Sequence, residues 1–166
     1  DALSIIENPF LEKGHASSNF DMDGVHLNEK NIIEKGYLQS YLLSSYSARK
    51  LGMKTTGNAG GSHNLMISPS KNTLENLIMG VDKGLLVTEL LGHGLNMVTG
   101  DYSRGAAGFW IEAGKIQHAV EEITIASNLK DMLLNIKAVG NDTYDNSSRY
   151  TGSIMIEPMT VATNSQ

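Results

Sequence analysis

The chain has 166 residues, enough for one domain with a sizeable core, and its 13 basic and 18 acidic residues give a formal net charge of −5. The charges are scattered, which disfavours a surface built for direct contact with nucleic acid or an anionic membrane. The absence of cysteine excludes disulfides, thiolate metal ligands and a cysteine nucleophile. No apolar run approaches the roughly 20 residues of a membrane span, so we expect a soluble chain. It begins at Asp1 rather than Met, and we expect a fragment of a longer protein.

The first part of the chain is predicted to form short strands joined by tight turns. The strands are expected over 3–7, 31–34, 37–43 and 64–67. The turn Lys35-Gly36, two residues ending in glycine, predicts a hairpin, and Asp23-Gly24 is a second hairpin signal. Later in the chain, Ala113-Gly114 predicts a third hairpin.

Two short helices interrupt these strands. A serine able to cap, followed by helix-forming residues, predicts a helix over 44–51, and a capping-box pattern at 72–75 predicts another. Between them lies the small, polar loop 55–62, whose glycines permit unusual dihedral angles. Loops of this kind often line functional sites.

The second part of the chain contains longer strands and the strongest helix pattern. Strands are expected over 85–91, 109–112, 115–118, 120–126, 153–156 and 159–162. Apolar residues with helical spacing predict a helix over 128–139 that stops at Gly140. The pattern indicates one α+β domain over 1–166, mainly antiparallel sheet in a sandwich- or barrel-like arrangement, with two or three single helices.

The histidines and glycines do not form a known metal or nucleotide motif. None of the five histidines belongs to HExxH or HxH, so ordinary surface or hydrogen-bonded histidines are favoured over a metal site built from this chain. The sequence Gly92-His93-Gly94 follows an apolar strand, but Met97 stands where the dinucleotide-binding pattern needs its third glycine. Phosphate-loop and nucleophile-elbow motifs are also absent.

The central sequence Gly100-Asp101-Tyr102-Ser103-Arg104-Gly105 allows two interpretations. The arginine could bind a peptide carboxylate, or the serine could act as a nucleophile. The alternative, which spacing favours, is an internal Asp101–Arg104 pair with Tyr102 bracing a tight turn, while Gly105 and Gly108 allow close sheet packing.

The same central segment resembles a known family. The sequence GDYSRGAAGFWIEAGKIQHAVEEITIASNLKDMLLNI over 100–136 is similar to the carboxy-terminal region of the TldD/PmbA family, specifically its PmbA (TldE) branch. Supporting segments are SSYSARKLG at 44–52, TGNAGG at 56–61, the run 84–91 and GSIMIEPMTVA at 152–162. The resemblance covers essentially the whole chain and implies an amino-terminal α/β portion that this sequence does not contain.

The resemblance implies a bacterial, cytoplasmic peptidase system, in which TldD and TldE together degrade unfolded peptides and mature modified peptide precursors. The family is also named as a modulator of DNA gyrase. Catalysis is attributed to the TldD branch, whose HExxxH helix and carboxy-terminal cysteine hold zinc. This chain has neither feature, so we expect no catalytic residue and no cofactor here, and zinc in a TldD-like partner.

For this chain the resemblance implies a non-catalytic subunit with a TldD-like subunit and unfolded or modified peptides as partners. Residues that we expect to line a shared chamber or the interface between subunits are Asn58, His63, His93, Asp101, Tyr102 and Arg104. Two alternatives stay open: the protein is itself a metalloprotease, or it is a non-proteolytic regulator that binds a partner such as gyrase.

Overall fold

The computed structural model describes residues 3–144 and 146–163, and its contacts divide the chain into two compact units. Unit 1 comprises Asp1–Ser70 and Asn141–Ser153, and unit 2 comprises Lys71–Gly140 and Ile154–Gln166. The chain thus passes from unit 1 to unit 2, returns to unit 1 and then passes to unit 2 again. Because two compact units can belong to one domain, the expectation of a single domain over 1–166 stays a prediction.

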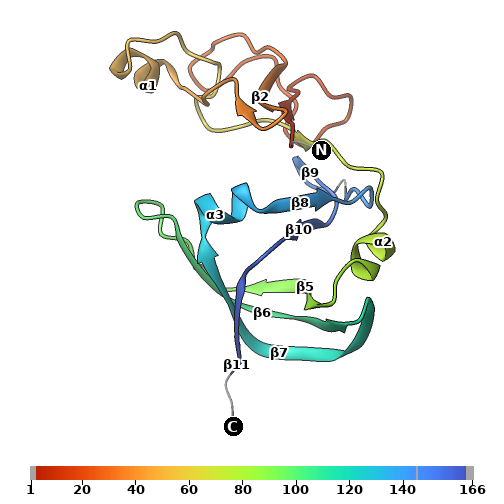
Figure 1. The fold of residues 1–166 in the computed structure, drawn as a ribbon. Helices are drawn as coiled ribbons and strands as arrows, with labels where there is room; N and C mark the ends of the chain where they lie inside the picture. Colours follow the sequence, from red (N-terminus) through yellow and green to blue (C-terminus); the bar gives the residue numbers. More distant parts are fainter. Residues whose placement is uncertain (1–2, 145, 164–166) are drawn as a thin grey trace. The chain divides into compact units, whose positions relative to one another are not determined.

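Unit 1 is built on a five-stranded sheet in the order β3-β2-β1-β4-β9 (Figure 1). Its strands are β1 (Ile5–Glu7), β2 (Lys30–Glu34), β3 (Tyr37–Leu38), β4 (Leu65–Ile67) and β9 (Arg149–Tyr150). All pairs are antiparallel except β4 with β9. The central strand β1 therefore has neighbours on both sides, and its last residue, Glu7, is completely buried.

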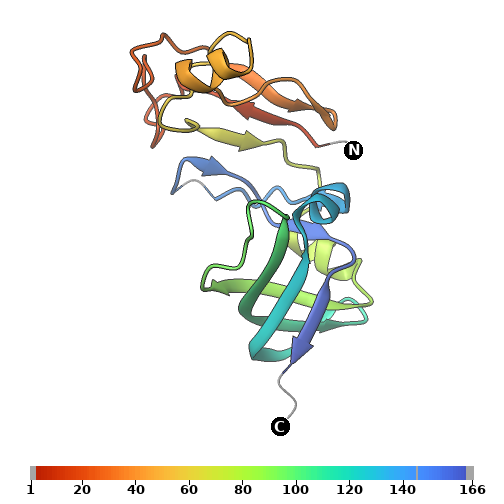
Figure 2. The same cartoon turned by 90° about the vertical axis from the view of Figure 1, so that its left-hand side faces the viewer.

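Unit 2 contains a four-stranded antiparallel sheet in the order β11-β7-β6-β5, whose strands lie side by side in Figure 2. These strands are β5 (Lys83–Leu91), β6 (Asp101–Glu112), β7 (Lys115–Asn128) and β11 (Thr160–Thr163). A separate antiparallel pair joins β8 (Ile136–Val139) to β10 (Ile154–Ile156). The core centres on Ala106, Ile123 and Ile125 of β6 and β7.

The turn chemistry of the sequence is confirmed at the hairpin turns 35–36 and 113–114. Lys35 and Gly36 have φ of 49° and 83°, and Ala113 and Gly114 have φ of 49° and 72°. Positive φ at both central positions matches the right-handed twist of the flanking strands, which is why glycine ends each turn.

All three described helices are single and short. Helix α1 (Ser45–Lys50) begins at its cap Ser44, and α2 (Leu74–Met79) begins at its cap Thr73. The third, α3 (Leu129–Leu134), is capped by Asn128, whose side chain accepts a hydrogen bond from Lys130 N at 3.0 Å. The predicted α+β class with mainly antiparallel sheet is confirmed.

The predicted extent of the helix over 128–139 is wrong. Helix α3 ends at Leu134, and Ile136–Val139 forms strand β8 instead. The cause is tertiary: β10 supplies backbone partners to these residues, so Val139 pairs with Ile154 and Ile136 with Ile156. The helical spacing of Ile136 and Val139 could not reveal a strand that pairs with them from later in the chain.

Close strand packing explains one glycine of the central segment. A Cβ atom on Gly108 would lie 1.9 Å from the Leu86 carbonyl oxygen on the neighbouring strand β5. Because that neighbour is backbone, it cannot move aside as a flexible side chain would. Glycine at 108 is therefore required for β5 and β6 to approach, as expected from the sequence.

Candidate functional site

The buried carboxylate of Glu7 organises one polar cluster in unit 1. Oε1 accepts hydrogen bonds from Asn58 Nδ2 at 2.9 Å and from the backbone N–H of His63 at 2.7 Å, and it lies 3.2 Å from His63 Nδ1. Oε2 pairs with Lys30 Nζ at 2.8 Å. Strand β1 delivers the carboxylate, β2 delivers the lysine, and the loop between α1 and β4 delivers the other two residues. The Glu7 carboxylate is thus surrounded by donors.

This environment favours the ionised form of Glu7. Burial by itself opposes the charge, but the hydrogen bond and attraction from Lys30, with the His63 donors, lower the pKa of the carboxyl below its ordinary value. Glu7 holds the loop 55–63 against the sheet through the hydrogen bonds that it accepts from Asn58 and His63. A general base needs a carboxylate oxygen that faces a substrate proton, whereas both oxygens of Glu7 are occupied by protein donors, so its role here is structural.

A second buried carboxylate, Asp21, fixes the other side of this loop. Its Oδ2 accepts a hydrogen bond from Ala59 N at 3.0 Å, while Oδ1 accepts from the backbone N–H groups of Asp23 and Val25, both at 2.9 Å. Burial opposes ionisation here too, but the three backbone donors lower the pKa of Asp21. The glycine-rich loop is therefore anchored by two carboxylates.

Arg149 on β9 adds a third anchor. Its Nη1 donates to the His63 carbonyl oxygen and its Nη2 donates to Ser62 Oγ, each at 2.9 Å. Thus His63 is held through its backbone N–H, its ring and its carbonyl. The two predicted site residues of unit 1, Asn58 and His63, meet on the same carboxylate, which makes them supports of the loop conformation.

The central segment of unit 2 is a strand, which corrects the expected tight turn. Residues Asp101, Tyr102, Ser103 and Arg104 open β6 and alternate between an exposed and a half-buried face. Because side chains of a strand alternate, Asp101 and Arg104 project to opposite faces of the sheet.

The internal Asp101–Arg104 pair is also wrong. Asp101 Oδ2 accepts a hydrogen bond from Thr99 Oγ1 at 2.7 Å, and Asn128 Nδ2 reaches Asp101 Oδ1 at 3.4 Å. No ion pair among the described residues involves either Asp101 or Arg104. Asp101 instead ties the start of β6 to the end of β7. Tyr102 lies on the other face and packs against the core of unit 2.

The predicted site residues are divided between the two units. Asn58 and His63 belong to unit 1, whereas His93, Asp101, Tyr102 and Arg104 belong to unit 2. His93 is exposed in the segment between β5 and β6. The sequence interpretation missed Glu7 and Lys30. A glutamate that directly follows Ile5 and Ile6 in a predicted strand was a signal that a buried charge would need a partner.

The family resemblance implies zinc in a TldD-like partner, and no metal site is found in the described part of this chain. Over residues 3–144 and 146–163, no three His, Cys, Asp or Glu side chains gather in a group that could hold a metal ion. We therefore assign no zinc ligand here.

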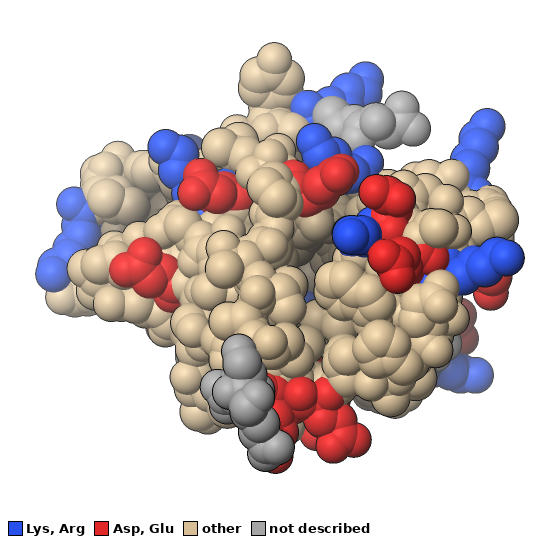
Figure 3. Space-filling model, turned by 60° about the horizontal axis from the view of Figure 1, so that its bottom comes forward, with Lys and Arg blue, Asp and Glu red and all other residues tan. Residues whose placement is uncertain are grey.

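Among the helices of residues 3–144 and 146–163, none has the length and apolar composition of a membrane span. On the face drawn in Figure 3, basic and acidic side chains both occur and neither sign covers the surface.

Comparison with known proteins identifies the family. A family model described as the PmbA/TldA metallopeptidase C-terminal domain matches residues 1–163. The metalloprotease PmbA of Escherichia coli O157:H7 is 52% identical over 162 residues, which are 98% of this chain and 36% of that protein. The chain thus spans little more than a third of this relative.

Solved structures agree with the sequence relatives. A proposed modulator of a DNA gyrase from Thermotoga maritima matches with a TM-score of 0.88 and 39% identity, over 97% of this chain and 39% of that one. TldE from Thermococcus kodakarensis matches with a TM-score of 0.82 and 25% identity, over 97% of this chain and 40% of that one. The chain belongs to the PmbA/TldA metallopeptidase family, as a C-terminal domain of its PmbA (TldE) branch.

Proposed function

We propose that this chain is the C-terminal domain of a non-catalytic subunit that supports a TldD-type zinc peptidase by associating with it. The assembly would degrade unfolded peptides and mature modified peptide precursors in the cytoplasm. Family membership supports the link to peptidase chemistry. The similarity to the PmbA (TldE) branch and the lack of cysteine in this chain support the assignment of zinc to the partner subunit.

The observation that carries the association is an exposed apolar segment of unit 1. Over 37–53, seven large apolar side chains are at least 42% exposed: Tyr37, Leu38, Tyr41, Leu42, Tyr46, Leu51 and Met53. Clusters of exposed apolar residues mark interaction sites, and tyrosine and methionine are enriched at the centres of interfaces between proteins. We call this segment the apolar segment.

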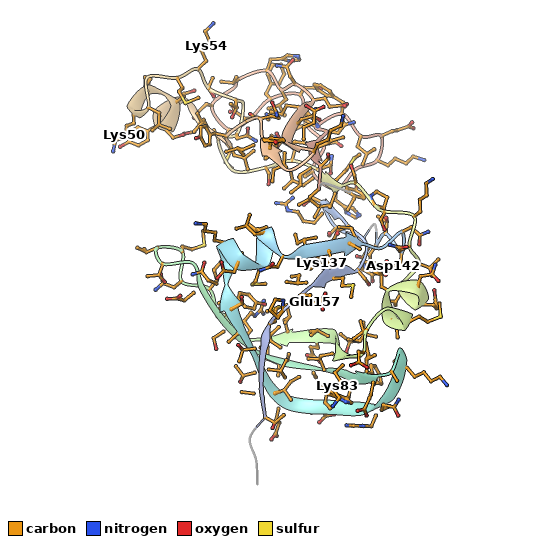
Figure 4. All side chains as sticks on the ribbon, viewed as in Figure 1. Lys50, Lys54, Lys83, Lys137, Asp142 and Glu157 are labelled. Atoms are coloured by element: carbon orange, nitrogen blue, oxygen red, sulfur yellow. The ribbon has the colours of Figure 1, made fainter. Side chains whose placement is uncertain are left out.

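The charge of the apolar segment is also unusual. No acidic residue occurs between Glu34 and Glu75, although the whole chain carries a net charge of −5. Three of the basic residues in this interval, Arg49, Lys50 and Lys54, are exposed in α1 and the turn after it. Figure 4 shows Lys50 and Lys54 extending outward there. A partner surface with carboxylates around an apolar centre would complement this segment.

We propose in addition that Arg104 and His93 face the peptide chamber or the partner subunit. Asp101, on the other face of β6, and Tyr102, against the core of unit 2, would contribute by fixing the start of this strand. Asn58 and His63 would act indirectly, by fixing the glycine-rich loop of unit 1. Substitution of Arg104 by alanine would then weaken partner binding or peptide turnover. If partner binding and peptide turnover were both unchanged, this role of Arg104 on β6 would be wrong.

The association is tested by measuring the affinity of the intact protein for its TldD-type subunit. We expect the double variant Tyr41→Ser with Tyr46→Ser to bind at least 10-fold more weakly, because it removes two exposed anchors. Tyr144→Ser is the matched control, since Tyr144 is 68% exposed in unit 1 but lies outside the apolar segment. Equal affinity of the double variant and the control would refute the role of the segment, and absence of binding by the wild type would refute the proposal.

Two other functions have support in the names of relatives. The Escherichia coli relative is itself named a metalloprotease, which favours independent proteolysis. The Thermotoga structure is described as a proposed modulator of a DNA gyrase, which favours a non-proteolytic regulator. Zinc-dependent cleavage by this protein alone would support the former, and gyrase binding without any cleavage would support the latter.

A further inference from the structure

Arg104 is a cation at the edge of an apolar core. On β6 it lies between Tyr102 and Ala106 on one face of the strand, and its register partner on β7 is the buried Ile125. Ala106 and Ile125 form the core of unit 2, and Tyr102 packs against them. The side chain of Arg104 is half-buried. A charge in this position normally has an acid partner or a full set of hydrogen bonds.

Arg104 has neither among the residues that the structure describes. Its one hydrogen bond runs from Nη2 to the carbonyl oxygen of Leu90, at 3.2 Å. The Nε atom is enclosed and has no hydrogen-bond acceptor. Leaving such a donor unsatisfied costs about 1–3 kcal/mol, and more for a charged group. An additional hydrogen-bond acceptor at Nε would therefore stabilise the guanidinium.

The backbone beside Arg104 is shaped around this side chain. A Cβ atom on Gly94 would lie 2.5 Å from Arg104 Cγ and 1.8 Å from the Ser103 carbonyl oxygen. Glycine at 94 thus lets the arginine lie across the neighbouring segment, where Ser103 N donates to Gly94 O at 2.7 Å. The stem of the arginine is held in place, while its head group lacks an anionic partner.

Apolar side chains stay exposed on the segment that Arg104 crosses. Leu90 and Leu95, whose partners Ala106 and Tyr102 lie on the same face of β6 as Arg104, are 41% and 39% exposed. The guanidinium can bind a carboxylate while the neighbouring exposed leucines contact an apolar group attached to that carboxylate. Inorganic anions and polyphosphates would gain nothing from the leucines.

We propose that Arg104 binds the carboxylate of a peptide. Nε and one terminal nitrogen of the guanidinium would donate to the two carboxylate oxygens in the parallel, bidentate geometry that arginine forms with this group. Binding would require a small movement of the side chain that uncovers Nε, and it would satisfy the donor that is now enclosed. The carboxylate comes either from the carboxy terminus of the peptide or from an acidic side chain. This inference names the chemical group that the start of β6 binds. It rests on the proposed function, because that function is what makes a peptide the source of the carboxylate.

The sequence makes a direct test possible, because the chain contains only three arginines, Arg49, Arg104 and Arg149. Their Nε–H signals in a ¹H–¹⁵N spectrum of the 166-residue chain are assigned with single Arg→Lys variants. The probes are acetyl-Ala-Ala-Leu with a free carboxylate, its carboxy-terminal amide, and acetyl-Ala-Glu-Ala amide. The last probe carries its carboxylate only on a side chain.

We expect the Arg104 Nε–H signal to shift saturably with at least one carboxylate probe, and at least 10-fold more weakly with the leucine amide. A response to the free leucine acid identifies the peptide terminus, and a response to the glutamate probe identifies an acidic side chain. Arg104→Lys, which keeps the charge but loses the fork, should weaken binding at least 10-fold. Lys115→Gln, at an exposed site of unit 2 that has no part in this proposal, should leave binding unchanged.

Absence of a saturable Arg104 shift with every carboxylate would overturn the inference. An equal shift with acid and amide would also overturn it. These results are distinct from a failure of the proposed function. A chain that binds its TldD-type subunit but no carboxylate contradicts only the ligand, whereas one that binds carboxylate but no subunit contradicts only the assembly.

Discussion

Replacing Glu7 with glutamine tests the polar cluster of unit 1, because it keeps the shape of the side chain and removes its charge. The Glu7 carboxylate is fully buried, and the side chain of its partner Lys30 is only 16% exposed. Removing one member of a buried ion pair costs about 3–5 kcal/mol. Because Lys30 keeps some contact with water, we expect the lower end, about 3 kcal/mol. For a chain of this size that is a fall of about 6–12 °C in Tm.

The assay is urea unfolding of the 166-residue chain followed by circular dichroism. The control is Glu112→Gln, which breaks the exposed pair between Lys83 and Glu112, whose N–O distance is 3.8 Å. Exposed pairs contribute at most about 1 kcal/mol. If Glu7→Gln costs no more free energy of unfolding than Glu112→Gln, the reasoning about the buried cluster is refuted.

The difference in free energy of unfolding between wild type and Glu7→Gln, measured as a function of pH, isolates the contribution of the Glu7 charge. Burial opposes ionisation, but the donors from Lys30 and His63 outweigh it and lower the pKa of the folded carboxyl. The folded protein therefore binds fewer protons at this site than the unfolded chain. The advantage of wild type over Glu7→Gln should be complete above the ordinary glutamate pKa and should disappear as pH falls through the lowered value. A gap that is unchanged from neutral to acid pH would show that the charge contributes nothing.

Further predictions concern packing, backbone and capping. Gly108→Ala should abolish soluble expression, because its Cβ would lie 1.9 Å from the Leu86 carbonyl oxygen, whereas Gly24→Ala, in open space with φ of 76°, should cost only about 1 kcal/mol in urea unfolding. Ile123→Ala should lower the free energy of unfolding by about 2–5 kcal/mol, because Ile123 is 4% exposed in the core of unit 2; a loss below 1 kcal/mol would contradict that position. Ser44→Ala should cost about 1 kcal/mol by the same assay, since its hydroxyl caps α1 through Ser47 N, and no change would mean that the cap is dispensable.

Local chemistry made much of the fold predictable. The turns Lys35-Gly36 and Ala113-Gly114 require positive φ, and the caps Ser44 and Thr73 satisfy the first N–H groups of their helices. These features depend on a few consecutive residues, so the sequence alone reveals them. The end of α3 depends instead on the distant strand β10, which is why the sequence predicted a longer helix.

The candidate site was harder to predict because its contacts join residues far apart in the chain. Glu7 meets Asn58 and His63 across more than 50 positions, and no motif links them. The Asp101–Arg104 pair looked reasonable from spacing, but strand geometry sends these side chains to opposite faces. Spacing also could not show that Nε of Arg104 is enclosed without an acceptor.

The measurement that tests the proposed function most directly is cleavage of an unfolded peptide by the intact protein and its TldD-type subunit, separately and mixed, with and without a chelator. We predict that the mixture cleaves the peptide, that this protein alone does not, and that chelation abolishes the activity. Chelator-sensitive cleavage by this protein alone would contradict the non-catalytic role.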